Sequence, residues 1–130
     1  MFKVRDLMTR DIVTVRQDTP VYEAMRVLVD NDITGLPVVG DDMTLLGIVT
    51  EKDMLRLLYE EHVENQPVER FMTRAVVSFG EDDTIIDVCE CLINNNFRRV
   101  PILSDGKLVG ILSRGDIIKY ILALRAAAPS

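Results

Sequence analysis

The chain contains no tryptophan, one histidine and two cysteines, so it has few of the residues that build metal sites or disulfide bonds. Cys89 and Cys91 stand two positions apart on a predicted helix and therefore point to different faces, which disfavours a bond between them. One cysteine pair and His62 do not give the ligand spacing of a zinc site. The sequence therefore predicts neither a resident metal nor a disulfide framework.

Long apolar runs and catalytic motifs are also missing. No run approaches the roughly 18 residues that a membrane helix needs, and the N-terminus lacks the apolar stretch of a signal peptide. We therefore expect a soluble, cytoplasmic protein without a membrane partner. His62 lies in an acidic run, no nucleophile has an evident base, and no phosphate-binding glycine-rich loop is present. These absences predict a protein that is not an enzyme.

Positive charge is scarce in the first half of the chain. The net charge is −6, and residues 1–65 carry 7 basic and 13 acidic groups, whereas residues 66–130 carry 8 of each. An acidic chain is a poor partner for nucleic-acid phosphates, so we do not expect nucleic-acid binding. The neutral half contains Arg98, Arg99 and Arg114, which leaves open the binding of a small anion in one cleft.

What the chain does have is an internal repeat. Residue types around 4–58 return in the same order around 68–122, at an offset of 64 that drops to 63 after one loop. A repeat of fixed period determines the architecture, and we place the two repeats at residues 1–62 and 63–130, within one integrated module. The matching segments are residues 8–10 with 72–74, 36–39 with 100–103, and 47–53 with 110–116.

Each repeat is predicted to form the element order β-α-β-β-α. The first strands are expected at residues 12–15 and 76–79, the second at 36–39 and 100–103, and the third at 45–49 and 108–112. A first helix follows the first strand, with Thr19 as N-cap and Pro20 at its first position in repeat one. Asparagines close these helices, at Asn31 and at 94–96, and a second helix starts after Thr50 and after Ser113.

The two first helices carry the same apolar stripe. Their apolar positions follow the spacing i, i+3, i+4, i+7, i+8, which lays one face of each helix on a core. The side chains differ between the repeats while the spacing is kept, which indicates a shared tertiary role. The stripes are Val21, Ala24, Met25, Leu28 and Val29 in one helix, and Ile85, Val88, Cys89, Leu92 and Ile93 in the other.

These elements predict an α/β (α+β) fold of two small mixed sheets packed with helices and related by a pseudo-twofold axis. A helix between the first and second strands makes them parallel, and the tight Asp105-Gly106 turn makes the third strand antiparallel to the second. Residues 60–66 are interpreted as a polar linker and residues 126–130 as a frayed tail. Residues 4–9 and 68–73 form amphipathic lead-ins, which we expect to dock on the opposite half.

One motif occurs in both repeats at the junction of the third strand and second helix: Gly-φ-φ-(Thr/Ser)-x-x-Asp, where φ is apolar. The hydroxyl and the carboxylate have the spacing of a capping box, which satisfies free backbone donors at a helix start. The same carboxylate can accept both hydrogens of a vicinal diol, and the free amides of a helix start attract phosphate. Both roles can coexist, and the sequence leaves them both open.

In this order of motifs the sequence resembles a tandem pair of CBS domains, the repeats named for cystathionine β-synthase. The resemblance covers nearly the whole chain. It depends on residues 6–9, on Ile33-Thr34-Gly35-Leu36-Pro37-Val38-Val39, on Phe97-Arg98-Arg99-Val100-Pro101-Ile102, and on both Gly-φ-φ-(Thr/Ser)-x-x-Asp units.

The resemblance implies a regulatory module that binds an adenosine ligand (AMP, ADP, ATP, S-adenosylmethionine or NAD) in clefts between the repeats, as in energy sensing. It further implies a homodimer through the flanking helices and an unidentified regulated partner. By resemblance, the ribose hydroxyls would be held by Asp53 and Asp116, with Thr50 and Ser113 beside them, and the base or sugar would lie near Thr14 and Ser78. The adenine would lie against the backbone at Pro37, Val38, Pro101 and Ile102. The phosphates would be bound by Arg98, Arg99, Lys52 and Arg114.

The repeats differ at one place that matters for a ligand. The positions of Arg98 and Arg99 are occupied by Thr34 and Gly35 in the first repeat, so only the second repeat carries charge there. If each cleft takes its phosphate contacts from one repeat only, one cleft would hold a phosphate and the other a neutral nucleoside or nothing. Sites of the family mix residues from both halves, so the sequence leaves open which aspartate is paired with the two arginines. The alternative function is a structural oligomerisation module with vestigial clefts, and for the two arginines the alternative is a solvated loop before a strand.

Overall fold

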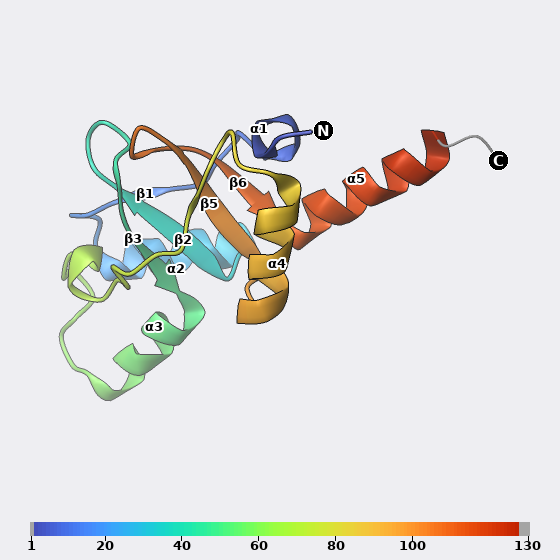
Figure 1. Ribbon diagram of the computed structural model, residues 1–130. Helices are drawn as coiled ribbons and strands as arrows, with labels where there is room; N and C mark the ends of the chain where they lie inside the picture. Colours follow the sequence, from blue (N-terminus) through green and yellow to red (C-terminus); the bar gives the residue numbers. More distant parts are fainter. Residues whose placement is uncertain (1, 128–130) are drawn as a thin grey trace. The chain divides into compact units, whose positions relative to one another are not determined.

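The computed structural model describes residues 2–127 (Figure 1). By their internal contacts, these residues divide into two compact units. The unit that we name the N-repeat unit is Val13–Val76, and the C-repeat unit combines Met1–Ile12 with Val77–Ser130. These units differ from the repeat boundaries of the sequence, because each lead-in clusters with the other repeat. The prediction that the lead-ins dock on opposite halves is therefore confirmed.

The N-repeat unit contains a three-stranded sheet in the order β1-β2-β3. Strand β1 (Val15–Arg16) is parallel to β2 (Gly35–Val39), and β3 (Leu45–Thr50) is antiparallel to β2, as predicted. The helices of this unit are α2 (Val21–Asp30), α3 (Glu51–Leu55) and the short 3-10 helices η1 (Arg56–Tyr59) and η2 (Val68–Arg70).

The C-repeat unit repeats this arrangement with the sheet order β4-β5-β6. Strand β4 (Phe79–Gly80) is parallel to β5 (Arg99–Ser104), which is antiparallel to β6 (Lys107–Ser113). Its helices are α1 (Val4–Leu7) in the lead-in, α4 (Ile85–Asn95) and α5 (Arg114–Ala127), and α5 extends beyond its sheet (Figure 1). No helix in the described part of the chain is both long and apolar enough to cross a membrane.

Two local predictions are wrong. The first strands were expected at residues 12–15 and 76–79, but ladder pairing begins only at Val15 and Phe79 and lasts two residues in each case. Thr19 is not the N-cap of α2: Pro20 holds that position, and the Thr19 hydroxyl accepts from the Arg16 amide at 3.0 Å. The free amides of α2 are bonded by backbone carbonyls of residues 64 and 66 instead.

Those carbonyls belong to the segment that was predicted to be a polar linker. Val21 donates to the Gln66 carbonyl at 2.9 Å, and Val63 is buried in the core of the N-repeat unit. The segment is therefore packed against the start of α2, which a linker would not be. The tail prediction is wrong for residues 126–127, which belong to α5, and residues 128–130 lie outside the described residues.

Proline in the middle of β2 and β5 is tolerated because of how the lead-ins pair. Pro37 lies opposite Ile48, and Ile48 turns its own amide and carbonyl away from β2 to bond Thr73 of the lead-in at 2.9 and 2.8 Å. The nitrogen of Pro37, which has no hydrogen to donate, therefore faces the side of β2 on which β1 lies. Strand β1 pairs with β2 only from Val38 onward, so the proline costs the sheet no hydrogen bond. Ile111 and Thr9 repeat the same pairing opposite Pro101.

Each unit has its own hydrophobic core beneath the sheet. The predicted stripes supply it through Val21, Ala24 and Leu28 in one unit and their equivalents in the other. The prediction that the last residue of each stripe packs on the core is wrong, because Val29 is 78% exposed and Ile93 is 72% exposed. A stripe of five positions is wider than the part of the helix that the small sheet covers.

Candidate functional site

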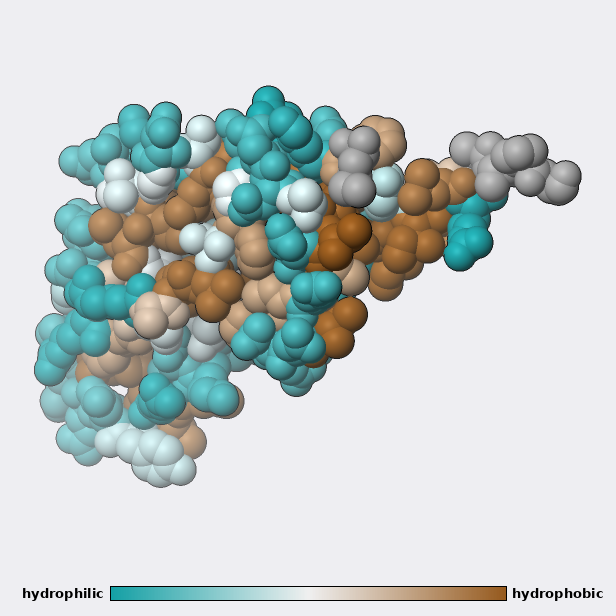
Figure 2. Space-filling model, viewed as in Figure 1, coloured by the Kyte–Doolittle hydropathy of each residue, from teal (hydrophilic) through white to brown (hydrophobic). Residues whose placement is uncertain are grey.

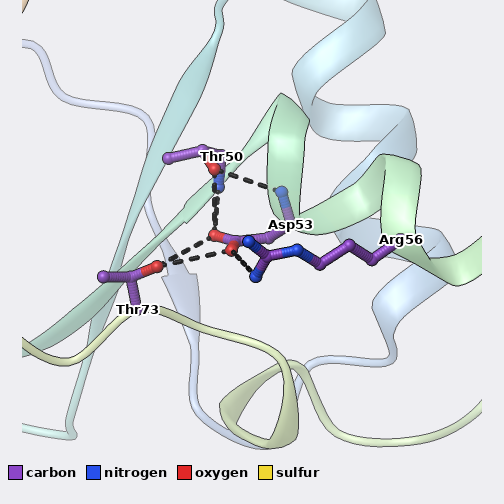
Figure 3. Close-up of polar contacts among 4 residues, drawn as sticks. All are labelled: Thr50, Asp53, Arg56 and Thr73. Atoms are coloured by element: carbon purple, nitrogen blue, oxygen red, sulfur yellow. Dashed lines mark hydrogen bonds and ion pairs between the residues drawn. The ribbon is translucent and has the colours of Figure 1, made fainter.

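The two Gly-φ-φ-(Thr/Ser)-x-x-Asp motifs form the predicted strand-to-helix junctions. At the end of β3, the Asp53 amide donates to Thr50 Oγ1 at 3.2 Å, and the Thr50 amide and hydroxyl both donate to Asp53 Oδ2 at 3.0 Å. This is a complete capping box at the start of α3. The box also fixes the direction of the carboxylate, as Figure 3 shows.

Two partners of Asp53 were not predicted from the sequence. The Thr73 hydroxyl, from the lead-in 20 residues away, donates to both carboxylate oxygens at 3.3 Å. Arg56, one helical turn after Asp53, places Nη1 at 3.8 Å from Oδ1 (Figure 3). With these partners Asp53 is only 7% exposed. The sequence could have predicted the Arg56 contact, because Arg56 stands three residues after Asp53 in the chain. The Thr73 contact depends on the pairing of the lead-in with β3, which no sequence spacing indicates.

The equivalent junction at the end of β6 is more open. The Ser113 amide donates to Asp116 Oδ2 at 2.9 Å, and the Asp116 amide donates to Ser113 Oγ at 3.1 Å. Asp116 is half-buried, and the described residues give its Oδ1 no hydrogen-bond partner. This oxygen keeps its lone pairs for another donor.

Arg99 lies beside this open carboxylate site. It pairs with Ser113 in the β5–β6 register, and its Nε is buried with no hydrogen-bond partner among the described residues. A buried polar atom without a partner is costly, and a bound anion is one kind of partner that would satisfy it. Neighbouring Arg98 is exposed and forms no side-chain bond within the described chain. The pair fits a phosphate or a similar anion.

Arg114 has a different environment from the one predicted. Its guanidinium donates to the carbonyls of Phe97 and Leu92 at 2.6 and 3.3 Å, and to Asn96 Oδ1 at 3.2 Å. These bonds close the C-terminal end of α4, where Asn96 takes the left-handed conformation. A phosphate would have to compete with them, so Arg114 is committed to helix α4 in this structure.

The remaining predicted positions divide into surface and core. Lys52 is exposed on α3, and Thr14 and Ser78 are half-buried directly before β1 and β4, with no side-chain hydrogen bond within the described chain. Pro37, Val38, Pro101 and Ile102 are all buried in the central strands, and Val38 and Ile102 are 0% exposed. No group of three potential metal ligands occurs among residues 2–127.

The sequence also matches a known family across both repeats: the model of the CBS domain matches residues 4–60 and 68–123. The chain belongs to the CBS domain family. A protein of Methanocaldococcus jannaschii is 31% identical over 118 residues, which are 91% of this chain and 42% of that protein. This CBS pair therefore spans less than half the length of that relative.

Two solved CBS pairs contain adenosine compounds. CBSX2 of Arabidopsis thaliana in complex with AMP is 32% identical, with a TM-score of 0.87 and coverage of 96% of this chain and 99% of that one. The CBS domain pair of protein MJ0100, in complex with 5′-methylthioadenosine and S-adenosyl-L-methionine, is 26% identical, with a TM-score of 0.78 and coverage of 95% and 98%. The described elements match the α+β fold of both.

Proposed function

We propose that this CBS pair is a regulatory module that binds an adenosine-containing ligand (AMP, ADP, ATP or S-adenosylmethionine) and signals to a separate protein. The observation that carries the proposal is the AMP complex of a relative that is 32% identical and is covered over 99% of its length. Ligand binding would shift a conformational or oligomeric equilibrium by the difference in affinity for its two states.

The residues of the C-repeat unit support this proposal best. Asp116 has an oxygen available for a sugar hydroxyl, and Arg99 has a buried donor available for a phosphate. Ser113 lies in register with Arg99 and holds the carboxylate in place. We assign the phosphate to Arg98 and Arg99 rather than to Arg114, because Arg114 is bonded to the end of α4.

Unfolding in the presence of ligand tests the function. At about 100 times its dissociation constant, a ligand that binds only the folded state is expected to add on the order of 2.7 kcal/mol to the free energy of unfolding. Denaturant unfolding should be measured with AMP, ADP, ATP, S-adenosylmethionine and NAD. No stabilisation by any of these compounds at millimolar concentration would refute the proposal.

The alternative function, an oligomerisation module, is favoured by one observation. Helices α4 and α5 border a hollow of about 430 Å³ with an apolar lining that includes Ile93, Ile117 and Ile118. Figure 2 shows hydrophobic residues along α5. Ile118 and Leu122, one turn apart, are 56% and 63% exposed. We propose that a second copy of the chain covers this face, in addition to ligand binding.

A charge in the hollow is expected to separate the copies. Ile118→Glu places a carboxylate in the apolar lining, and taking a charge out of water in an interface between two copies is unfavourable. Ile86→Glu is a matched control, because Ile86 is also 56% exposed and lies on α4 but does not line the hollow. Sedimentation at tens of micromolar should give a monomer for the first variant and a dimer for the second. A dimer in both cases would exclude this face.

A further inference from the structure

The two motif carboxylates, equivalent in sequence, differ in how many of their oxygens are engaged. Asp53 accepts from Thr50 on Oδ2 and from Thr73 on both oxygens, and Arg56 lies near Oδ1 (Figure 3). Asp116 accepts only on Oδ2, from Ser113, within the described chain. The largest difference between the two sites is therefore the hydroxyl of Thr73.

Thr73 is held at Asp53 by its backbone. It exchanges two hydrogen bonds with Ile48, at 2.8 and 2.9 Å, and it lies against Gly47, where a Cβ atom would approach the Thr73 carbonyl oxygen to 2.7 Å. Thr9 has the same backbone pairing with Ile111 in the other unit, yet no bond joins its hydroxyl to Asp116 in the described chain. Both units therefore have the same backbone pairing, but only the N-repeat unit has the contact between the threonine hydroxyl and the carboxylate, within the described residues.

A threonine hydroxyl shared between two carboxylate oxygens makes the same contact that a sugar hydroxyl makes. An ionised carboxylate has about four acceptor positions, and a vicinal diol needs two of them. Thr73 is exposed, so its side chain can rotate away from Asp53 while the backbone bonds to Ile48 remain. The contact is therefore an internal competitor that a ligand can displace.

We propose that Thr73 is a positioning residue that blocks Asp53 against sugar diols, so that the two subsites fill in sequence. The inference rests on the proposed function. Asp116 accepts a nucleotide first, and Asp53 accepts one only at higher concentration, after the Thr73 hydroxyl has turned away. Because Thr73 lies in the lead-in that continues into the C-repeat unit, occupancy of Asp53 removes a side-chain contact from the segment that joins the repeats.

Removal of the hydroxyl is expected to strengthen the weaker subsite. Thr73→Val keeps the shape of the side chain and removes the donor, so AMP should bind the Asp53 subsite roughly three- to tenfold more tightly, the range of one lost competing hydrogen bond. The measurement is calorimetric titration of AMP into Asp116→Ala protein with and without Thr73→Val, so that only the Asp53 subsite is observed. Thr73→Ser restores the hydroxyl and should restore the weaker affinity.

Two controls separate this role from a general effect on folding. Thr9→Val changes the matched residue of the other unit, which has no carboxylate contact, and should leave the affinity unchanged. 2′,3′-Dideoxyadenosine monophosphate lacks the diol, so Thr73→Val should not improve its binding. If Thr73→Val does not fold, Thr73→Ala replaces it in the same titrations.

The outcomes distinguish this inference from the proposed function. AMP binding that depends on Asp53 and Asp116 but is equal in Thr73→Val and wild type would overturn the inference and leave the function standing. Equal gains with AMP and with the dideoxy compound would overturn it as well, because the effect would not involve the diol. Wild-type protein that binds no AMP would overturn the proposed function, and the inference with it.

Discussion

Replacement of Asp116 by alanine is expected to weaken AMP binding by roughly 100-fold. Hydrogen bonds to a charged group contribute about 1.5–3 kcal/mol each, and the variant loses the carboxylate that would accept the sugar hydroxyls. Oδ1 is the oxygen left open by the described chain, whereas Oδ2 is engaged by the Ser113 amide. Calorimetric titration of AMP measures the loss, and we expect the remaining weak binding to depend on Asp53.

The same substitution also removes a helix cap, so the control must account for that effect. Asp87 is the matched residue, because it lies in the first turn of α4, where its amide donates to Thr84 Oγ1 at 3.3 Å. Asp87→Ala removes a carboxylate from a helix start and should reduce stability by about 0.3–1 kcal/mol without changing AMP affinity. Undiminished AMP binding by Asp116→Ala would exclude the carboxylate as a ligand contact.

Alanine at Gly47 is expected to lower the free energy of unfolding by about 2–4 kcal/mol. Its Cβ would lie 2.7 Å from the Thr73 carbonyl oxygen and 2.8 Å from Met72 Sδ. The lead-in must then move away from β3, which strains the packing and weakens the two bonds between Ile48 and Thr73. Denaturant unfolding measures the change.

Alanine substitutions at two other glycines provide a comparison, because the space available for a new Cβ differs at each position. At Gly110 the nearest atoms to a new Cβ are Sδ and Cγ of Met8, at 2.5 and 2.8 Å, and a flexible methionine side chain can move more easily than a backbone carbonyl. At Gly40 the nearest atoms lie at 3.8 Å, which is ordinary contact, so alanine there should change stability by less than about 0.5 kcal/mol. The expected order of destabilisation is Gly47, Gly110, Gly40. Equal stability of the Gly47 and Gly40 variants would show that the lead-in does not pack tightly on β3.

The fold was predictable because the sequence contains the same pattern of elements in two repeats. The Asp105-Gly106 turn takes two left-handed residues in succession, with φ of 53° and 79°, as its composition predicts. The spacing from Thr50 to Asp53 and from Ser113 to Asp116 predicted both capping interactions. These features are local, and local geometry follows from residue type and spacing.

The partners of those residues were not predictable in the same way. Thr73 is 20 residues from Asp53 in sequence, and Arg114 is 17 residues from the Phe97 carbonyl that it caps. Residues 64 and 66, interpreted as linker, bond the start of α2 in place of the predicted Thr19 cap. Each of these contacts depends on how separate segments pack, which the pattern along one segment does not contain.

The sequence by itself determined the duplicated β-α-β-β-α order, the capping motifs and the presence of the Arg98-Arg99 pair in the second repeat only, because all three depend on residue order and spacing alone. Only the tertiary structure decided that the lead-ins exchange between the repeats and that one motif carboxylate is covered while its twin is open. The physical reason is that a hydroxyl competes for a carboxylate only when the packing of a distant segment brings it within hydrogen-bond distance.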